Sequence, residues 1–368
     1  MQMTVGREES RPPIRNMKNT KQNIKNAERG DCAPEVEAAT DTAKVRMMTE
    51  EKAAKDPVFK QYGAPFVINE SKKVTLNERA VAAKCATMHQ VKYAPTTKTY
   101  TRFDNGSGLW VTIHEVEVRR LLGDLLLHLG KEYEQEDFVQ TSKTSLYNSV
   151  AKMLQSYDAD IEPAGMVGLF HVANGLLDLR QKKPNLITHS AKYDFKISSG
   201  ITFDPKAKCP RFLRELLEPA LEKDDITLLQ KYFGSMLLGA NTCHGILLVR
   251  GTPGGGKSTL VSLLEKMLSE SMVAHLRTQH LNGRFETSAF LGKRVLVGKD
   301  VPGDTLSEKG ARMLKSLVGG DLLQAEIKYN PNKQMIRGDF HVVITSNNNL
   351  RIALDGDDDA WRRRLLIV

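Results

Sequence analysis

The feature that most constrains the fold of this chain is the segment Gly251-Thr252-Pro253-Gly254-Gly255-Gly256-Lys257-Ser258, which has the pattern GxxxxGK[ST]. A short apolar run, Ile246 to Val249, precedes this segment and is typical of a buried parallel strand. After it, apolar residues recur with the spacing of one helix face: Leu260, Leu263, Leu264, Met267 and Leu268. Strand, glycine-rich loop and helix in this order predict a P-loop within an α/β fold, a parallel sheet flanked by helices.

The residue types of this segment indicate what it binds. Glycines let the loop backbone turn its N–H groups toward phosphate oxygens, and the amino end of the following helix adds positive charge. In such a loop Lys257 contacts the β- and γ-phosphates and Ser258 ligates Mg²⁺. We therefore expect residues 251–259, including Thr259, to bind ATP with Mg²⁺.

Two later segments can complete a hydrolytic site. The strand-like run that begins at Arg294 ends near Asp300, whose carboxylate can hold Mg²⁺ and the attacking water; Asp304 is a weaker alternative. The buried-strand pattern of residues 340–345 leads directly to Asn347. Polar groups at the carboxyl ends of strands contact ligands in open α/β sheets, so Asn347 is expected to sense the γ-phosphate or orient the water. The alternative for Asn347 is an asparagine-rich turn.

An arginine cluster follows at Arg362, Arg363 and Arg364. Arginine stays charged and forks onto phosphate oxygens, so Arg362 or Arg363 can supply a cation to the transition state. If that cation acts on a neighbouring subunit, the protein is an oligomer with ATP at its interfaces. The alternative is a basic patch that neutralises residues 357–359.

A candidate nucleic-acid contact lies between these motifs. The segment Glu326 to Pro331 is predicted to be a strand that enters an Asn-Pro turn. Lys328, at the tip of such a hairpin, can contact a phosphate backbone without reading sequence. A solvated turn lysine explains the composition equally well.

In this order, these pieces resemble the superfamily-three helicase domain of phage and plasmid primase-helicases, a group that includes the poxvirus primase-helicase. The resemblance spans residues 165–368 and includes a series of local matches: Asn282-Gly283-Arg284-Phe285-Glu286, Leu291-Gly292-Lys293-Arg294, Asp300-Val301-Pro302, Gly319-Gly320-Asp321 and Trp361-Arg362-Arg363. It implies an AAA+-like ATPase that forms a ring, expected to be a hexamer, and pulls single-stranded DNA through its centre. It also implies that Lys257, Asp300, Asn347 and one of the two arginines serve hydrolysis, and that Lys328 grips DNA.

The chain departs from the family pattern in three respects. Asp300 stands where relatives usually have glutamate, so its carboxylate reaches one methylene less far. The sequence ends at Val368, soon after the arginine signature, which suggests a truncated product. Residues 1–165 show no acidic primase pattern, so we expect any primer synthesis to come from a separate primase.

Composition narrows the choice of partner and compartment. The formal net charge of +9 and the pI of about 9.2 suit a polyanionic partner. Four scattered cysteines without a CxxC pair argue against a zinc ribbon and favour a reducing compartment. With no signal peptide and no apolar run of membrane-spanning length, we expect a protein of the cytoplasm of a bacterial host that does not enter a membrane.

The chain divides into three parts by pattern. Residues 1–55 are expected to be a disordered tail with a basic and then an acidic section, or alternatively a basic arm for nucleic acid. Residues 56–205 are expected to be an α+β accessory domain, with a hairpin around residues 104–108 packed by Trp110. Residues 206–368 are expected to be the ATPase domain.

The leading hypothesis is an ATP-driven DNA helicase or translocase that replicates a phage, plasmid or other mobile element. A motor of the AAA+ type that remodels protein or serves defence is the second. A nucleotide-dependent DNA-binding scaffold with little hydrolysis is a further alternative, suggested by Asp300. A small-molecule kinase is disfavoured because nothing in the sequence indicates an acceptor pocket.

Overall fold

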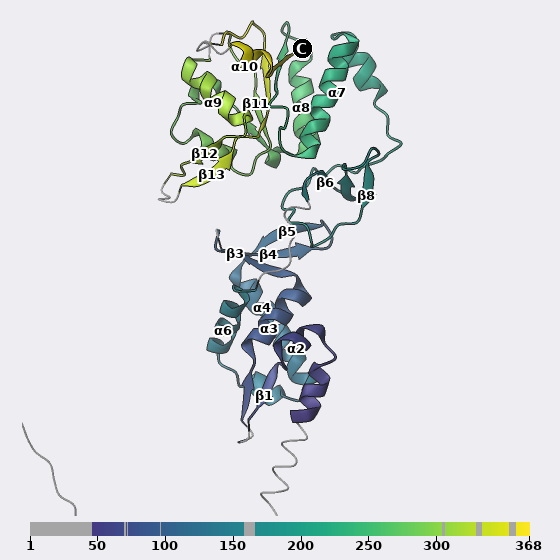
Figure 1. Ribbon diagram of the computed structural model, residues 1–368. Coiled ribbons are helices and arrows are strands. Elements are labelled where there is room, and N and C mark those ends of the chain that lie inside the picture. Colours follow the sequence, from purple (N-terminus) through teal and green to yellow (C-terminus); the bar gives the residue numbers. More distant parts are fainter. Residues whose placement is uncertain are drawn as a thin grey trace, which may run out of the picture.

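The computed structural model describes residues 46–69, 71, 73–95, 97–157, 166–303, 306–328, 333–352 and 358–368. The predicted tail before residue 46 lies outside the described residues, as do Asp304, Pro331 and Asp357. Figure 1 shows an upper body built from the carboxyl-terminal part of the chain, a lower body rich in helices, and two small sheets between them.

Five parallel strands form the sheet of the upper body. Their spatial order is β10 (Val273–His275), β11 (Val295–Gly298), β14 (His341–Ser346), β9 (Ile246–Arg250) and β15 (Leu365–Ile367). Side chains alternate between two cores: Ile246 and Leu248 pack in one, Leu247 and Val249 in the other. Helices cover both faces, which explains why these strands are apolar without a polar side. The predicted mixed α/β fold with a parallel sheet flanked by helices is confirmed.

The upper body contains helices α7 (Lys223–Leu238), α8 (Lys257–Leu268), α9 (Glu308–Val318) and α10 (Asp358–Arg362). Short helical turns are η2 (Phe212–Leu217, of the π type), η3 (Glu270–Met272), η4 (Thr278–His280) and η5 (Glu286–Phe290). On α8 the buried face contains Val261, whereas Leu263, predicted to be on that face, is 42% exposed. The helix is therefore rotated slightly from the face that the leucine spacing indicated.

A hairpin of β12 (Leu322–Ala325) and β13 (Gln334–Arg337) extends from the upper body (Figure 1). The prediction of a strand that begins at Glu326 was wrong, because the strand that pairs with β13 ends one residue earlier, at Ala325. Lys328 thus lies in the connection between the two strands.

The lower body begins with a helical stretch at residues 46–53. Its other elements are α2 (Pro57–Tyr62), β1 (Phe66–Ile68), β2 (Val74–Leu76), α3 (Glu78–His89), α4 (Glu115–Glu132), α5 (Glu136–Gln140) and α6 (Thr144–Leu154). Alanines and Cys85 on the buried face of α3 let α6 pack closely, and α4 adds a row of leucines to the same core. None of the helices in the described ranges is long and apolar enough to cross a membrane.

Two antiparallel sheets lie between the bodies: β3 (Val91–Ala94), β4 (Thr99–Asp104) and β5 (Leu109–Ile113), then β6 (Leu169–Val172), β7 (Gly175–Asp178) and β8 (Asn185–Ile187) (Figure 1). The predicted hairpin is β4–β5, and Trp110 is buried against Phe103 with its indole N–H donating to the Tyr193 carbonyl oxygen. Phe170 and Leu177 pack with the core beside α7, while Leu169 joins a small cluster that contacts Leu109. The boundary near residue 205 remains a prediction.

Candidate nucleotide site and basic surface

The loop of residues 251–256 connects the carboxyl end of β9 to the amino end of α8. Gly254 and Gly256 have φ angles of +80° and +83°, which side-chain-bearing residues rarely adopt. A Cβ atom on Gly256 would lie 2.7 Å from Cδ1 of Leu216. The backbone conformation therefore favours glycine at position 256, and a larger residue would also displace the Leu216 side chain.

The amino end of α8 leaves donors for a ligand. No side chain of the described residues caps this helix, and the Leu260 N–H donates to the Gly256 carbonyl oxygen at 2.9 Å. The N–H groups before Leu260 in the first turn have no intrahelical acceptor, as at every helix start. Together with the helix dipole they favour an anion at this end.

The ammonium group of Lys257 lies within the loop itself. Its Nζ donates to the carbonyl oxygens of Gly251 and Thr252, each at 2.8 Å, and the residue is only 7% exposed. Both acceptors are neutral, so phosphate oxygens would be stronger partners for this cation. Ser258 and Thr259 are exposed at the same end of α8.

A cavity of about 320 Å³ adjoins the loop. The loop contributes Gly251, Thr252 and Lys257 to its lining, and an apolar part comes from the end of η2 and the residues that follow, within 216–221. Residues 216–221 were not predicted to belong to the site. The apolar part is the kind of surface that accepts an aromatic base, while the polar part fits phosphates.

Asp300 and Asn347 lie at the same edge of the sheet as the loop. Asn347 directly follows β14, the neighbour of β9, and Asp300 follows β11, the next strand along. The Asp300 N–H donates to Oγ1 of Thr345 at 3.0 Å, and the Gly251 N–H donates to the Ser346 carbonyl oxygen at 3.3 Å. The ends of the three strands are thus connected by hydrogen bonds.

Both side chains are available to a ligand. Asp300 and Asn347 are exposed, and Asp300 has a φ of +49°, an unusual conformation for a residue other than glycine. Strain of this kind is concentrated at functional sites. Within the described ranges no three His, Cys, Asp or Glu side chains group to hold a metal. Mg²⁺ here would depend on Ser258, Asp300 and the nucleotide's own phosphates, a donor set of hard oxygens that fits this ion.

The arginines occupy the opposite edge of the sheet. Leu365 pairs with Ile246 at the start of β9, and the Ile246 N–H donates to the Arg364 carbonyl oxygen at 2.7 Å. Arg362 and Arg363 are exposed and immediately precede this point. The loop begins at the other end of β9, about 13 Å from Ile246 at about 3.3 Å per residue. The structure therefore does not bring them together with the loop of the same chain.

A separate basic surface surrounds Lys328. Its Nζ lies 5.7 Å from the centre of the Phe285 ring, and Cζ of Arg284 lies 5.4 Å from the same ring. Phe285 is 38% exposed and lines a cavity of about 640 Å³ with both cations. Phe285 was not predicted to be a contact residue; the signal for it is an aromatic residue beside a basic one after Asn282-Gly283.

One carboxylate organises the cations of this surface. Glu326 is paired with Arg284 at 2.5 Å and with Lys333 at 3.0 Å. The hydrogen bond from Arg284 contributes most to lowering the pKa of Glu326, and the one from Lys333 lowers it further. Arg277 and Glu286, which also line the cavity, are paired with each other. None of these three ion pairs involves Lys328, whose contact is with the aromatic ring.

Comparisons with known proteins place these features in context. Residues 249–364 match a family described as a family of unknown function (DUF5906). A search of curated proteins finds no match. Among solved structures, the A form apo structure of the NrS-1 C terminal region has a TM-score of 0.47 and 14% identity, covering 78% of this chain and 60% of that one. The apo structure of NrS-1 C terminal region (305-718) has a TM-score of 0.47 and 15% identity, covering 79% and 61%.

The chain spans about three fifths of those solved structures, 60% and 61% of their length. At this level of identity the likeness says nothing about the activity of the chain.

Proposed function

We propose that this chain binds ATP with Mg²⁺ and hydrolyses it. The observation that carries the proposal is the convergence of the 251–256 loop, Asp300 and Asn347 at one edge of a parallel sheet. In such sheets ligands bind beyond the carboxyl ends of the strands. Lys257 would hold the β- and γ-phosphates, Ser258 and Asp300 the metal, and Asn347 the attacking water. Bound Mg²⁺ bridges phosphate oxygens and neutralises developing charge.

The proposed active form is a ring, with six subunits as the expected number. Arg362 and Arg363 are exposed near the amino end of β9, whereas the loop lies at its carboxyl end, which supports a role for them in a neighbour's site. A cation supplied by a second subunit stabilises the charge of phosphoryl transfer. Mixing Arg363→Ala chains with Lys257→Ala chains tests this: restored turnover supports the arrangement. The same mixture is made with Arg362→Ala chains. If neither mixture turns over ATP faster than its component variants alone, the proposed arrangement is ruled out.

Single-stranded DNA is the proposed track. The surface of Lys328, Arg284 and Phe285 combines cations with an exposed ring, the pairing that binds single strands through phosphates and stacked bases. The net charge of +9 favours the same partner. The resulting activity is an ATP-driven helicase or translocase for replication of a phage, plasmid or other mobile element, with primers made by a separate primase. Its expected compartment is the bacterial host cytoplasm.

The DNA assignment is tested by Lys328→Ala. We expect basal ATPase to be kept while its stimulation by single-stranded DNA falls. Lys266→Ala, at an exposed position near the end of α8, removes the same charge and serves as the control. Equal loss in both variants would attribute the effect to net charge and count against the assignment of Lys328.

A binding scaffold with little hydrolysis is the second candidate, favoured by Asp300. The chain has aspartate, not glutamate, at the sheet edge, and its backbone is held at a φ of +49°. Asp300→Glu extends the carboxylate by one methylene. A large gain in turnover would indicate a site limited by reach, whereas a loss would indicate that the backbone already positions Asp300 for hydrolysis. Turnover that does not respond to DNA would instead favour a protein-remodelling motor.

A further inference from the structure

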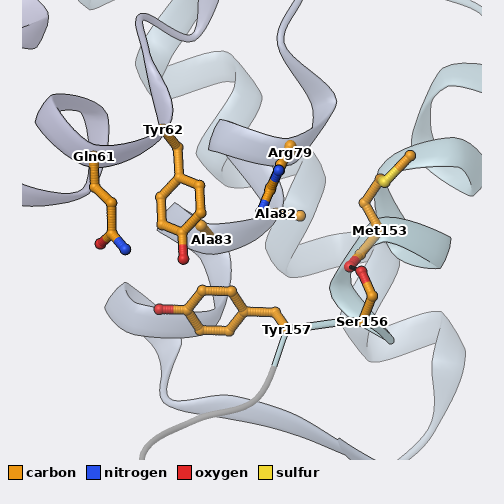
Figure 2. A pocket seen from close by; sticks show the side chains of 8 residues that line it. All are labelled: Gln61, Tyr62, Arg79, Ala82, Ala83, Met153, Ser156 and Tyr157. Atoms are coloured by element: carbon orange, nitrogen blue, oxygen red, sulfur yellow. Dashed lines mark hydrogen bonds between the residues drawn. The ribbon is translucent and has the colours of Figure 1, made fainter.

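A second cavity lies in the lower body, away from the 251–256 loop. It encloses about 680 Å³ between α2, α3 and the end of α6. Figure 2 shows Tyr62 and Tyr157 facing one another, with Arg79 beside them and the alanines of α3 behind. The two rings meet edge to face at 6.2 Å between centroids. No sequence motif pointed to this place.

Small residues on α3 create the space. Arg79, Ala82 and Ala83 are three and four residues apart, so they share one face of the helix. Both alanines are buried, and a larger side chain at either position would fill the floor of the cavity. Polar groups of Gln61 and Ser156 stand at its rim. The cavity therefore combines an apolar floor, aromatic walls and hydrogen-bonding groups.

The aromatic walls are held from outside the cavity. Gly63, with a φ of +89°, ends α2, and the Tyr62 carbonyl oxygen accepts from Nδ2 of Asn77 at 3.0 Å. Asn77 also caps the amino end of α3, which fixes Tyr62 relative to Arg79. The Tyr157 hydroxyl lies 3.3 Å from Oγ1 of Thr87. Both rings are thus placed without a ligand.

The charge at the cavity is positive. Within the described ranges Arg79 makes no ion pair; its guanidinium lies 5.4 Å from the centre of the Tyr62 ring. The neighbouring carboxylate of Glu78 accepts a hydrogen bond from the Ser149 hydroxyl, and Lys84 is paired with Asp56. Arg79 also stands in the first turn of α3, where the helix dipole adds to its charge. An anion beside an aromatic group would find both partners here.

We propose that this cavity binds a nucleotide, with the base against the tyrosines and the alanine floor and the phosphate on Arg79. A volume of about 680 Å³ is within the range of small-ligand pockets. Arginine forks onto phosphate, and tyrosine rings stack on any base. The nucleotide comes either free or as one unit of a single strand. This site is independent of ATP hydrolysis, because its residues belong to the lower body.

The test uses the full chain carrying Lys257→Ala, so that the loop of the upper body does not contribute. Binding of thymidylate and adenylate is measured by calorimetry, and binding of labelled oligothymidylate by fluorescence anisotropy. If the mononucleotides bind as strongly as the oligomer, the ligand is a free nucleotide. If only the oligomer binds, and Arg79→Gln abolishes that binding, the ligand is one unit of a single strand.

We expect Tyr157→Ala to weaken binding by about tenfold, from the worth of one stacked base. Arg79→Gln should weaken it and reduce the slope of log affinity against log salt by about one. Tyr157→Phe keeps the ring, and Arg120→Ala removes an exposed charge on α4; both should bind normally.

Arg79 is exposed, so Arg79→Gln should remain folded and gives a result even if Tyr157→Ala does not. The proposal is overturned if folded Arg79→Gln binds every probe as its parent does. It is also overturned if an acidic peptide binds while no nucleotide does. The proposed function is tested separately, by measuring the DNA-stimulated ATPase of a chain that carries Arg79→Gln and retains Lys257.

Discussion

Gly256→Ala tests the assigned loop most locally. The residue has a φ of +83°, so alanine there enters the left-handed region at a cost of about 1–2 kcal/mol. Its new Cβ would also lie 2.7 Å from Cδ1 of Leu216. Because that methyl is the end of a flexible side chain on the wall of the 320 Å³ cavity, it can move, but it moves into the space assigned to the base.

Two other glycines separate these effects. Gly254 has a φ of +80° and nothing within 4 Å of its added Cβ, so Gly254→Ala carries the backbone strain alone. Gly234, in the middle of α7, has no positive φ and an equally open Cβ position. Gly234→Ala should stabilise the protein by about 0.5–1 kcal/mol, because alanine is the better helix former.

The assay is urea unfolding together with ATP binding for the three variants. We expect Gly254→Ala and Gly256→Ala to lose about 1–2 kcal/mol of unfolding free energy unless the loop relaxes. Gly256→Ala should lose more ATP affinity than Gly254→Ala. Adding Leu216→Ala to the Gly256→Ala chain should restore part of the lost affinity. Equal ATP affinity in Gly256→Ala and Gly234→Ala would refute the assigned loop geometry.

Three further predictions concern separate parts of the upper body. Phe285→Ala should weaken single-stranded DNA binding by about 1–3 kcal/mol in an anisotropy titration, the worth of one stacked base, while Phe285→Trp retains it. Tyr232→Phe should cost about 1–3 kcal/mol in urea unfolding, because the buried hydroxyl lies 2.9 Å from the Val342 carbonyl oxygen and accepts from the Val342 N–H at 3.1 Å. Burial lowers the pKa of His341 to about 4 from 6.5. As the pH falls, His341 therefore takes up a proton in the unfolded state before it does so in the folded state. The stability that neutral His341 contributes is complete above pH 6.5 and falls by about 3 kcal/mol as the pH drops toward 4. Denaturation at several pH values measures this loss, which should shrink in His341→Phe.

Sequence patterns located the sheet edge because its residues carry strong local signals. Apolar runs bounded by glycine or polar residues identified β9, β11 and β14, and the residues after them are Gly251, Asp300 and Asn347. Chain order could not give the strand order, however. β14 lies between β9 and β11 through contacts made across the sheet, and this places Asn347 nearer the loop than Asp300.

Other features depend on contacts distant in sequence. The cavity of the lower body combines Tyr62, Arg79 and Tyr157 from three elements, and no single segment signals it. The contact of Lys328 with Phe285 joins a hairpin connection to a turn before η5. The π-type geometry of η2 has no signal of its own in the sequence, because apolar residues have similar spacing in π- and α-helices.

The most direct test of the account is steady-state ATPase of the full chain, with and without single-stranded DNA, beside Lys257→Ala. We predict turnover that rises with DNA and disappears in the variant, because the Lys257 ammonium, which donates to two carbonyl oxygens of the loop, is the cation proposed to bind the phosphates. Turnover of the same size in Lys257→Ala would contradict it.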